Sequence, residues 1–478
     1  DEGFTQFLTS RCMEHLEGDS MDLNTNRTGL DKFFFEPQRT RDQQVYNGYF
    51  RSVITADRDP QLNTHSDQFL HHRDYGQVYY KTATMLYNLE YVLGEGLFEE
   101  ALQHYFNQWK FCHPYFDDFR TSIIQYTEVD LNWFFDQWLE TDKEIDYAIS
   151  GFNKTGEGQY ELKIERRGAM QMPLSISLFD GEGKAYEYWI PNSDFVKNTD
   201  AVILPKWLGW NDVNSTYTVL LDSVLNIKQV AIDASETIAD VYALDNKLPL
   251  PVNIELNDFS WTNPTRNYEV EWNPSIWYNG YDGLKFGIEA KGRFFNKFHR
   301  IESGLWFNSG VIQQAKGLEN TSLKNEFFRF NYKLNYATPL KKVSKGLELE
   351  AYTSWLDGLL RQKLGWSKRL SNGKTELGQH IHSLYRPNAV ALNYLIYPDL
   401  WNGDSWNNFI DSRLIHRYGY ARNSSGKVSV TLRTPFLGSD YNYGYLRSES
   451  INENRFSKFN WRTRIFGQFG IGESWAPE

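Results

Sequence analysis

The spacing of apolar side chains changes along the chain and divides it into three stretches. From residue 1 to about 145, apolar residues recur every three or four positions, which is the period of an amphipathic helix. From about 146 to 250, and again from about 251 to 478, they alternate with polar residues, which is the period of a β-strand. The sequence therefore predicts a helical domain at 1–145, a small β-domain at 146–250 and a larger antiparallel β-domain at 251–478.

Several helices are predicted in the first stretch. One opens the chain, and four of its apolar side chains share a face: Phe4, Phe7, Leu8 and Cys12. A second covers 75–93 and ends before Gly94, because glycine commonly follows the last turn of a helix. Later helices have their apolar residues within 98–109, 119–126 and 131–139.

Polar residues mark where these helices begin and what lies between them. Asp118 and Asp130 precede apolar helical runs, so each is the predicted N-cap of its helix. The connections are short, which indicates a compact helical bundle. The segment 19–74 is rich in Asn, Asp, Arg and Gln, and we expect it to wrap the bundle as long loops.

The second stretch contains a series of short strands. Tyr160, Leu162 and Ile164 alternate with charged residues, and the run Asp-Gly-Glu-Gly at 180–183 joins two strands as a hairpin. About seven short strands in about a hundred residues are typical of an immunoglobulin-like β-sandwich. We expect this domain to be a spacer or wall, because nothing in its pattern indicates chemistry.

The third stretch contains longer strands with one apolar, aromatic-rich face and one charged face. Phe286 and Ile288, for example, alternate with Lys285, Glu289 and Lys291. Strands of about 9 to 11 residues are long enough to cross a bilayer when they are tilted. Trp and Tyr gather near the strand ends, as in the interfacial girdles of membrane barrels. These features favour an antiparallel transmembrane β-barrel with a charged lumen.

A second interpretation of the third stretch stays open. A soluble β-domain also alternates apolar and polar residues, so alternation alone does not decide between the two. The sequence ends in Gly-Glu-Ser-Trp-Ala-Pro-Glu, without the terminal aromatic residue usual in outer-membrane barrels. We therefore expect the set of strands to be incomplete, since an open barrel would expose unpaired strand edges to lipid.

Composition limits the function classes further. The 478 residues carry a formal net charge of −11, which argues against nucleic acid as a partner, because phosphate binding needs a basic surface. Apolar residues make up 41% of the chain, enough for substantial cores. Cys12 and Cys112 do not define a disulfide framework, so the redox compartment stays open. No apolar run approaches the ~20 residues of a membrane-spanning helix, and residue 1 does not begin a signal peptide.

Two residues are candidate site residues, and each has an ordinary alternative. Glu2 lies at the start of the first helix, where the helix dipole favours any carboxylate. Tyr79 lies on an apolar helix face, where a tyrosine is usually part of the core. Three histidines, His65, His71 and His72, lack the spacing that places two imidazoles on one helix face, so we expect surface or structural roles for them.

The segment DEGFTQFL at the start of the chain resembles the Asn/Asp-Glu-Gly-Phe segment of the M1 family of zinc metallopeptidases, the gluzincins. Three later segments resemble helices of the same catalytic domain: VYYKTATMLYNLEYVLGEGLFEEAL, WKFCHPYFDDF and DLNWFFDQWLET. The resemblance implies that Glu2 is the third protein ligand of a zinc ion. It also implies that Tyr79 is the catalytic tyrosine, which donates a hydrogen bond to the oxyanion of the tetrahedral intermediate. The neighbouring Tyr80 points about 100° away around the helix, so both cannot serve one site.

The same resemblance implies that part of the site lies elsewhere. In the family, a His-Glu-x-x-His helix supplies the other two zinc ligands and the general base, and this motif does not occur in the sequence. We expect this helix upstream of residue 1 in the whole protein. One carboxylate is not a zinc site, so this chain alone should neither hold the catalytic zinc nor hydrolyse peptides.

The resemblance extends beyond the helices. M1 peptidases carry a similar β-sandwich directly after the helical domain, and AIDASETIADVYALDNKLP at 231–249 resembles its end. The three parts together resemble Bacteroidetes-type M1-like peptidases with a C-terminal outer-membrane barrel. The predicted function is therefore that of a zinc-dependent peptidase fragment, an aminopeptidase by resemblance, anchored in the Gram-negative outer membrane. Its predicted partners are peptide or protein substrates and outer-membrane lipid.

An alternative function is also open. The chain would then be a non-catalytic outer-membrane barrel protein whose peptidase-like domain serves binding or assembly, since a fold alone does not establish a function. An intact His-Glu-x-x-His motif in the whole protein would favour the enzyme, and a degenerate motif would favour the binding protein.

Overall fold

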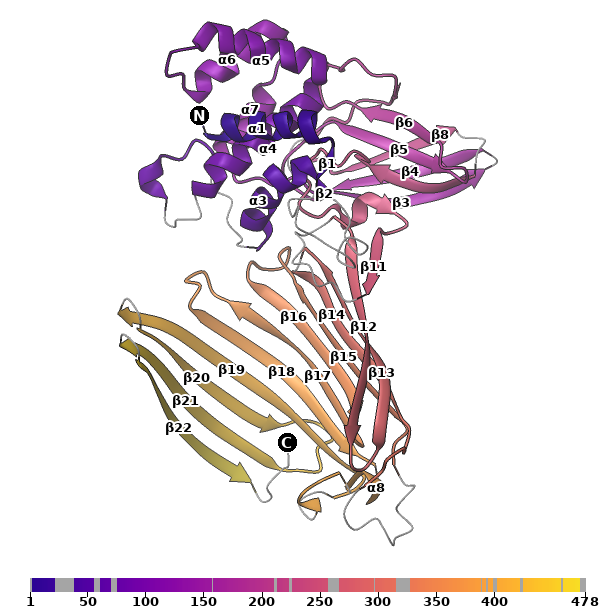
Figure 1. The fold of residues 1–478 in the computed structure, drawn as a ribbon, viewed down its shortest axis with the longest axis vertical. Helices are drawn as coiled ribbons and strands as arrows, with labels where there is room; N and C mark the ends of the chain where they lie inside the picture. The colour runs from indigo at the N-terminus through magenta and orange to yellow at the C-terminus, as the bar shows by residue number, and fades with distance from the viewer. Residues whose placement is uncertain are drawn as a thin grey trace. The chain divides into compact units, whose positions relative to one another are not determined.

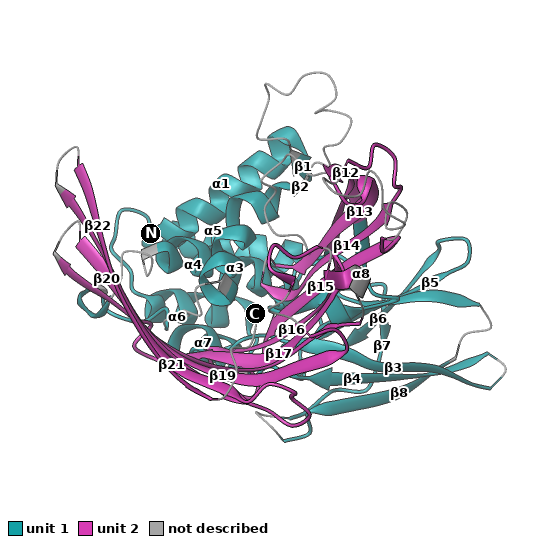
Figure 2. Ribbon diagram, turned by 90° about the horizontal axis from the view of Figure 1, so that it is seen from below, with its two compact units in different colours: residues 1–253, 259–268 teal, residues 254–258, 269–478 magenta. Residues whose placement is uncertain are grey.

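A computed structural model of the chain describes residues 2–21, 38–55, 61–69, 75–156, 158–209, 213–222, 226–256, 266–295, 297–314, 327–387, 389–392, 394–398, 402–421, 424–456 and 459–472. The chain forms two compact units (Figure 2). Unit 1 consists of residues 1–253 and 259–268, and unit 2 consists of residues 254–258 and 269–478. The finer division into three domains stays a prediction.

Unit 1 begins with helices, and all of those below except the short α3 are predicted by the sequence (Figure 1). They are α1 (Glu2–Glu17), α3 (Asn47–Phe50), α4 (Tyr75–Leu93), α5 (Glu95–Trp109), α6 (Phe116–Thr127) and α7 (Asn132–Glu140). Ring contacts link Phe119 to Phe135, Phe135 to Phe134, and Phe134 to Trp138, and all four side chains are buried. The helical N-terminal part is therefore confirmed.

The polar segment before α4 differs from its prediction. Residues 42–55 are helical, as η1 (Asp42–Tyr46), α3 and η2 (Arg51–Thr55), where the sequence predicted long loops. The helical turns form because Val45, Tyr46 and Phe50 are buried, and their burial outweighs the polar composition of the segment. The loop prediction is wrong for these residues. The other described elements of the segment are β1 (Ser20–Met21), β2 (Gln38–Arg39) and η3 (Ser66–Gln68).

Two helix starts also differ in detail. Tyr115 is the N-cap of α6, and its backbone N–H donates to the carboxylate of Asp118 at 2.8 Å. Asp118 therefore stabilises the first turn from inside the helix and is not its N-cap. Leu131 is the N-cap of α7, and Asp130, one residue earlier, accepts from the backbone N–H of Asn132 at 3.1 Å.

Two β-sheets complete unit 1. Their strand orders are β3-β4-β8 and β10-β9-β5-β6-β7. The strands are β3 (Tyr147–Gly156), β4 (Gln159–Arg166), β5 (Leu174–Asp180), β6 (Ala185–Ile190), β7 (Val202–Ile203), β8 (Thr216–Asp222), β9 (Ile227–Ile232) and β10 (Lys247–Leu248), and η5 (Ala243–Asn246) precedes β10.

The alternation predicted for these strands is confirmed. Tyr160, Leu162 and Ile164 of β4 are all buried. The hairpin at 180–183 joins β5 and β6, and the carboxylate of Asp180 accepts from the backbone N–H groups of Glu182 and Lys184. The immunoglobulin-like topology stays a prediction.

Unit 2 is built on a sheet that, over the described residues, has twelve strands, and each strand pairs with its neighbours in sequence. The sheet is strongly curved (Figure 1). Its strands are β11 (Val252–Leu256), β12 (Tyr268–Asn279), β13 (Gly283–Phe294), β14 (Phe298–Asn308), β15 (Phe330–Pro339), β16 (Leu347–Leu356), β17 (Leu359–Arg369), β18 (Thr375–Arg386), β19 (Ser405–Ala421), β20 (Ser424–Pro435), β21 (Tyr443–Phe456) and β22 (Phe459–Gly472). The short helix α8 (Ala389–Leu392) lies between β18 and β19 in sequence.

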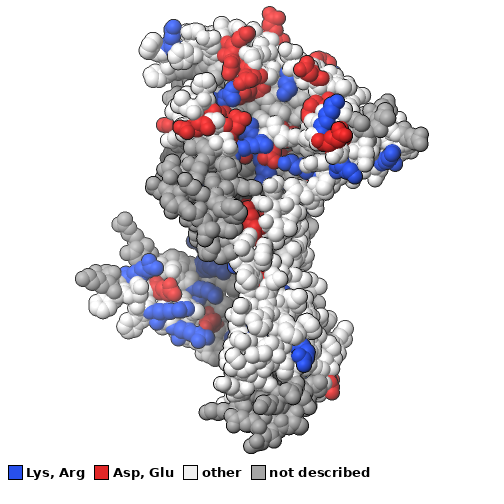
Figure 3. Space-filling model, turned by 45° about the vertical axis from the view of Figure 1, so that its right-hand side comes forward, with Lys and Arg blue, Asp and Glu red and all other residues white. Residues whose placement is uncertain are grey.

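The two faces of this sheet carry opposite chemistry, as the sequence predicts. One face, here called the apolar face, is exposed: four residues in register on β12 to β15 are 40–68% exposed, namely Ile276, Phe286, Phe307 and Phe330. The other, here called the polar face, is partly buried, and Lys285 on it is 1% exposed. In Figure 3, the sheet surface at the lower right has few charged side chains, whereas charged side chains gather on the surface at the lower left.

Closure of the sheet is not confirmed. In the strand order of the described residues, β11 and β22 are the two ends, and no pairing joins them. The closed-barrel prediction therefore stays a prediction. Among the helices that the structure describes, none combines the length and apolar character needed to span a membrane.

Candidate functional site

The first helix crosses α4 at a glycine. A Cβ atom added to Gly3 would lie 2.2 Å from the Cβ atom of Thr82 and 2.8 Å from the carbonyl oxygen of Val78. No real side chain tolerates such contacts, so the close approach requires glycine. Helix packing therefore explains the glycine of the Glu-Gly-Phe motif, and the packing brings the first turns of α1 and α4 together.

Glu2 and Tyr79 flank this crossing. Glu2 precedes Gly3 as the first residue of α1, and Tyr79 follows Val78 as the fifth residue of α4. Both residues are exposed, Tyr79 to 38%. The structure thus locates the two predicted site residues at adjoining helix starts, where solvent reaches both. Their chemical roles stay predictions.

The adjacent tyrosines of α4 have different surroundings. The ring of Tyr80 packs on Gly48 of α3, where an added Cβ atom would lie 2.4 Å from the ring. Tyr79 shares one face of α4 with Ala83 and Leu86. Those two side chains are fully buried, whereas Tyr79 lies at the exposed end of the face. Tyr80 is therefore a packing residue, whereas the side chain of Tyr79 is accessible.

Aromatic contacts hold α1 against its neighbours. The ring of Phe4 lies edge-on to Phe119 of α6, with 4.9 Å between ring centroids, and stacks with Tyr105 of α5 at 5.9 Å. The ring of Phe7 lies edge-on to Tyr87 of α4 at 4.7 Å. These contacts fix the direction of α1 and therefore the position of its first turn.

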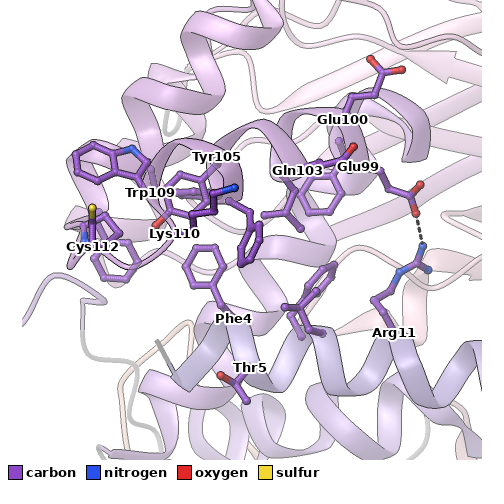
Figure 4. A pocket seen from close by; sticks show the side chains of 18 of the residues that line it. Phe4, Thr5, Arg11, Glu99, Glu100, Gln103, Tyr105, Trp109, Lys110 and Cys112 are labelled. Carbon is purple, nitrogen blue, oxygen red and sulfur yellow. Dashed lines mark hydrogen bonds and ion pairs between the residues drawn. The ribbon is translucent and has the colours of Figure 1, made fainter.

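A cavity of about 1080 Å³ lies beside α1, lined by residues of α1, α5 and α6 (Figure 4). Phe4, Leu8 and Tyr105 line it, and Arg11 lies at its edge. Leu8 is 51% exposed and Cys12 is exposed, so the apolar face predicted for α1 is only partly buried. The physical reason is that α1 turns Gly3, Phe7 and Ser10 towards the core, whereas Leu8 borders the cavity.

Arg11 forms ion pairs with carboxylates from three helices. Its guanidinium lies 2.8 Å from Glu95 and 3.4 Å from both Glu90 and Glu99, and the bond to Glu99 is drawn in Figure 4. Glu14 of α1 lies 3.5 Å away. Burial raises the pKa of Glu90 to about 7, against the opposing effect of Arg11. Glu90 therefore exchanges its proton near neutral pH.

The predicted surface histidines are only partly described. His65 is exposed and lies 2.7 Å from the carboxylate of Asp67, which agrees with a surface role. His71 and His72 lie outside the described residues, and so does Asp1 of the opening motif.

A group of ligand-type side chains in unit 2 was missed by the sequence analysis. His380, His382 and Asp411 lie together on the polar face of β18 and β19, and over the described residues no other group has the spacing of metal ligands. Glu2 is not part of such a group. The available signal was the His-x-His spacing within an alternating strand, because residues two apart on a strand share a face.

Comparisons with known proteins give a partial likeness. Residues 1–138 match the peptidase family M1 domain. The chain also matches the crystal structure of Legionella pneumophila aminopeptidase A in complex with aspartic acid, with 14% identity and a TM-score of 0.30. That match covers 50% of this chain and 23% of the other, and so low a TM-score supports no conclusion about function. No curated protein matches the chain. The N-terminal helical part of this protein is thus peptidase-like, with the likeness to family M1 extending over residues 1–138.

Proposed function

We propose that the chain is part of a zinc-dependent metallopeptidase of the M1 type, an aminopeptidase by resemblance, that unit 2 anchors in the outer membrane. The match of residues 1–138 to the peptidase family M1 domain carries the peptidase part. The close crossing at Gly3 supports it, because the crossing sets Glu2 and Tyr79 at adjoining helix starts. The substrates would be peptides or proteins.

Glu2 would be one protein ligand of the zinc ion. When bound, zinc polarises the scissile carbonyl and activates water. Catalytic zinc sites have three protein ligands, and within the described residues no other His, Cys, Asp or Glu joins Glu2 in a ligand set. The remaining ligands would come from outside these residues.

Tyr79 would stabilise the charge that develops on the substrate. Its phenol hydroxyl is a hydrogen-bond donor on an accessible side chain, and the adjoining helix start carries Glu2. A donor aimed at a developing oxyanion typically contributes a factor of about 10²–10³ in kcat. The rigid packing of α1 on α4 would keep this donor in place.

The apolar face of unit 2 supports the membrane anchor. It exposes many large apolar side chains, among them Leu305, Leu364, Leu432 and Phe469, each by 46–68%. Soluble monomers rarely expose contiguous apolar patches of more than a few hundred Å². A lipid surround would remove this face from water, while the charged residues of the polar face pair with one another, as Lys363 does with Glu350 at 2.6 Å.

The catalytic roles are tested in the full-length protein with two substitutions. Glu2→Ala should lose both bound zinc and peptide hydrolysis, because it removes a ligand. Tyr79→Phe should keep zinc but lower kcat about 10²–10³-fold, because it removes only the hydroxyl donor. Zinc content is measured by elemental analysis and hydrolysis with aminoacyl and longer peptide substrates.

Two matched variants serve as controls. Tyr80→Phe removes the hydroxyl from the neighbouring tyrosine that packs on Gly48, and Glu17→Ala removes an exposed carboxylate at the other end of α1. Both should keep zinc and activity. A Tyr79→Phe variant that hydrolyses substrate as fast as the parent would falsify the oxyanion role.

A second candidate is a non-catalytic outer-membrane protein with a peptidase-like binding or assembly domain. The observation that favours it is that Glu2 belongs to no group of three or more metal-ligating residues among those that the structure describes. This candidate predicts that the full-length protein holds no zinc that depends on Glu2 and hydrolyses no peptide.

A further inference from the structure

Three metal-ligating side chains meet on the polar face of unit 2, far from the α1–α4 crossing in sequence. His380 and His382 are two residues apart on β18, so both imidazoles lie on one face of the strand. In the ladder between β18 and β19, Asp411 is the direct partner of His380, and Phe409 is the partner of His382. Asp411 is thus directly across from one histidine and diagonal to the other.

The ligand atoms of this group converge. His380 Nδ1 and His382 Nε2 each lie 3.1 Å from the same oxygen, Asp411 Oδ1. All three ligand atoms lie within 4.8 Å of one another. The three side chains are buried, at 5–8% exposure. Ligand atoms around one zinc ion, with bonds of about 2.0–2.1 Å, lie roughly 3–3.5 Å apart.

We propose that His380, His382 and Asp411 bind one divalent transition-metal ion between β18 and β19. Two imidazoles and one carboxylate suit zinc and its neighbours in the first transition series better than magnesium or calcium. Three protein ligands leave a coordination position for water or another ligand. This site is separate from the proposed peptidase site and does not depend on it.

The surrounding residues match the outer shell of a metal site. His380 Nε2, the ring nitrogen that faces away from Asp411, lies 3.5 Å from the Glu350 carboxylate. Asp411 Oδ2, the oxygen that faces away from the histidines, accepts from Arg413 at 3.2 Å. Metal-bound histidines commonly donate their second N–H to a carboxylate, which fixes the ring and its tautomer. His380 and Asp411 therefore each have one atom for the ion and a second atom beside a supporting partner.

A glycine makes room for this arrangement. On β17, Gly365 lies between Glu350 of β16 and His380 of β18 in the same row of the sheet. An added Cβ atom at Gly365 would lie 2.5 Å from the His380 ring. The missing side chain lets the imidazole of His380 extend across β17 towards Glu350.

The second histidine is held by stacking. The ring of His382 stacks on Phe409 with 4.6 Å between centroids and 7° between planes. The guanidinium of Arg433 lies 4.2 Å from the centroid of the same Phe409 ring. The stack limits rotation of the imidazole, so His382 Nε2 stays directed at Asp411. Such preorganisation of ligands favours ion binding.

Without an ion, the same contacts have a second explanation. A protonated His380 would donate to Asp411 through Nδ1 and face the Glu350 carboxylate, 3.5 Å away, with Nε2. With an ion, a neutral His380 uses the Nδ1 lone pair for the metal and donates Nε2–H to Glu350. A metal-free imidazolium cluster is therefore the specific alternative to the proposal.

A small cavity of about 70 Å³ adjoins the site. His380, Glu350, Lys363 and Arg413 are among the residues that line it. Since a water molecule occupies about 30 Å³ in the liquid, this space holds roughly two. Of the three proposed ligands, only His380 lines this cavity.

The proposal is tested by counting bound metal in detergent-solubilised protein. The purified protein is stripped with chelator, exposed to excess Zn²⁺, desalted and assayed by elemental analysis. The parent should retain one more zinc per chain than His382→Gln or Asp411→Asn. His299→Gln is the matched control, because His299 is another histidine of the same sheet, bonded to Tyr336 at 2.7 Å, and should keep the parent's zinc content. Circular dichroism verifies that each variant keeps its β-sheet.

A second measurement uses the unmodified sequence. Cu²⁺ with ascorbate in air oxidises histidines that bind the copper, and mass spectrometry locates the oxidised residues. Oxidation should concentrate on His380 and His382 and fall when excess Zn²⁺ competes. Equal zinc in the parent and the two ligand variants, or oxidation spread evenly over the histidines, would overturn the proposal in favour of the metal-free cluster. Glu2→Ala separates the two hypotheses, because it should leave this zinc in place whether or not the peptidase proposal holds.

Discussion

At the scale of single residues, glycines decide which side chains can meet. Gly3 lets α1 touch α4, Gly48 receives the ring of Tyr80, and Gly365 leaves space for the imidazole of His380. In each case glycine is required because a Cβ atom would overlap a neighbouring residue, and not because the backbone forms a turn. These three contacts can therefore be tested by adding one methyl group.

Gly3→Ala should destabilise the helical region by about 1–3 kcal/mol, because the new methyl group overlaps Thr82 and forces α1 away from α4. The measurement is denaturant unfolding of the variant against the parent. Gly96→Ala is the control, since an added Cβ atom at Gly96 meets nothing within 4 Å. Its stability should stay unchanged or rise by up to about 1 kcal/mol. Equal stability of Gly3→Ala and the parent would contradict the close crossing.

Glu90 should make stability depend on pH. Its folded-state pKa of about 7 lies above the ordinary value of 4.5, so the protonated form is favoured by folding. This contribution is fully present below pH 4.5 and is lost as pH rises through 7, by roughly 3 kcal/mol in all. Unfolding midpoints measured from pH 4 to 8 should show the loss in the parent and a flatter profile in Glu90→Gln. The exposed Glu17→Gln control should follow the parent, and a Glu90→Gln profile as steep as the parent's would exclude Glu90 as the source.

Single-residue patterns in the sequence identify the candidate site residues only in part. Local patterns gave Glu2 and Tyr79 ordinary alternatives, and only the family resemblance singled them out. The i, i+4 spacing that places two imidazoles on one helix face does not include the His-x-His spacing, which places them on one face of a strand. Convergence of His380 with Asp411 depends on the register of two strands separated by a long connection, and no single-sequence pattern contains that register.

At the scale of elements, the periods in the sequence predicted the type of each segment well. The helix at 75–93 was predicted with the bounds that α4 has. The error fell where tertiary contacts outweigh composition, as in the helical turns at 42–55. A period identifies an apolar face, but which part of that face is buried depends on neighbours that lie far away in sequence.

One element junction in unit 1 depends on a buried carboxylate. Asp240 is 2% exposed and accepts from the backbone N–H groups of Tyr147 and Tyr242 and from the side chain of Asn246, at 2.8–3.0 Å. It thereby joins the start of β3 to the segment around η5. Asp240→Ala should cost about 3 kcal/mol or more, because three buried donors lose their acceptor.

Asp240→Asn provides the matched comparison for this junction. The amide keeps one acceptor oxygen of the same shape, so its loss of stability should be smaller than that of the alanine variant. Thermal unfolding of the two variants and the parent gives the order of their stabilities. If both variants lose the same amount, the hydrogen bonds to the carboxylate do not account for the effect.

At the scale of the whole molecule, the alternation predicted one apolar face and one charged face for unit 2, and the structure has both. Sequence alone could not decide whether the apolar face meets water, protein or lipid, because all three environments give the same period. Nor could it decide closure, which depends on pairing between strands that are distant in sequence. The membrane anchor therefore remains a proposal with a direct test.

Leu364→Arg tests the lipid surround. Leu364 is 55% exposed on the apolar face, with Ala351 and Ile381 as its ladder partners. In lipid, an arginine near the bilayer midplane costs about 2–4 kcal/mol, whereas in water the same substitution should be nearly neutral. The measurement is the unfolding free energy in lipid vesicles. Ser367→Arg, on the polar face of the same strand, is the control and should cost less. Equal costs for the two variants would argue against lipid at the apolar face.

The strand order of unit 2 has a consequence for how such a sheet changes in evolution. Every described strand from β12 to β22 is hydrogen-bonded only to the strands before and after it in the chain. Duplicating or deleting two consecutive strands therefore preserves the direction and the partners of all the others. The width of the sheet can grow or shrink in steps of one hairpin, without rewiring the connections that remain.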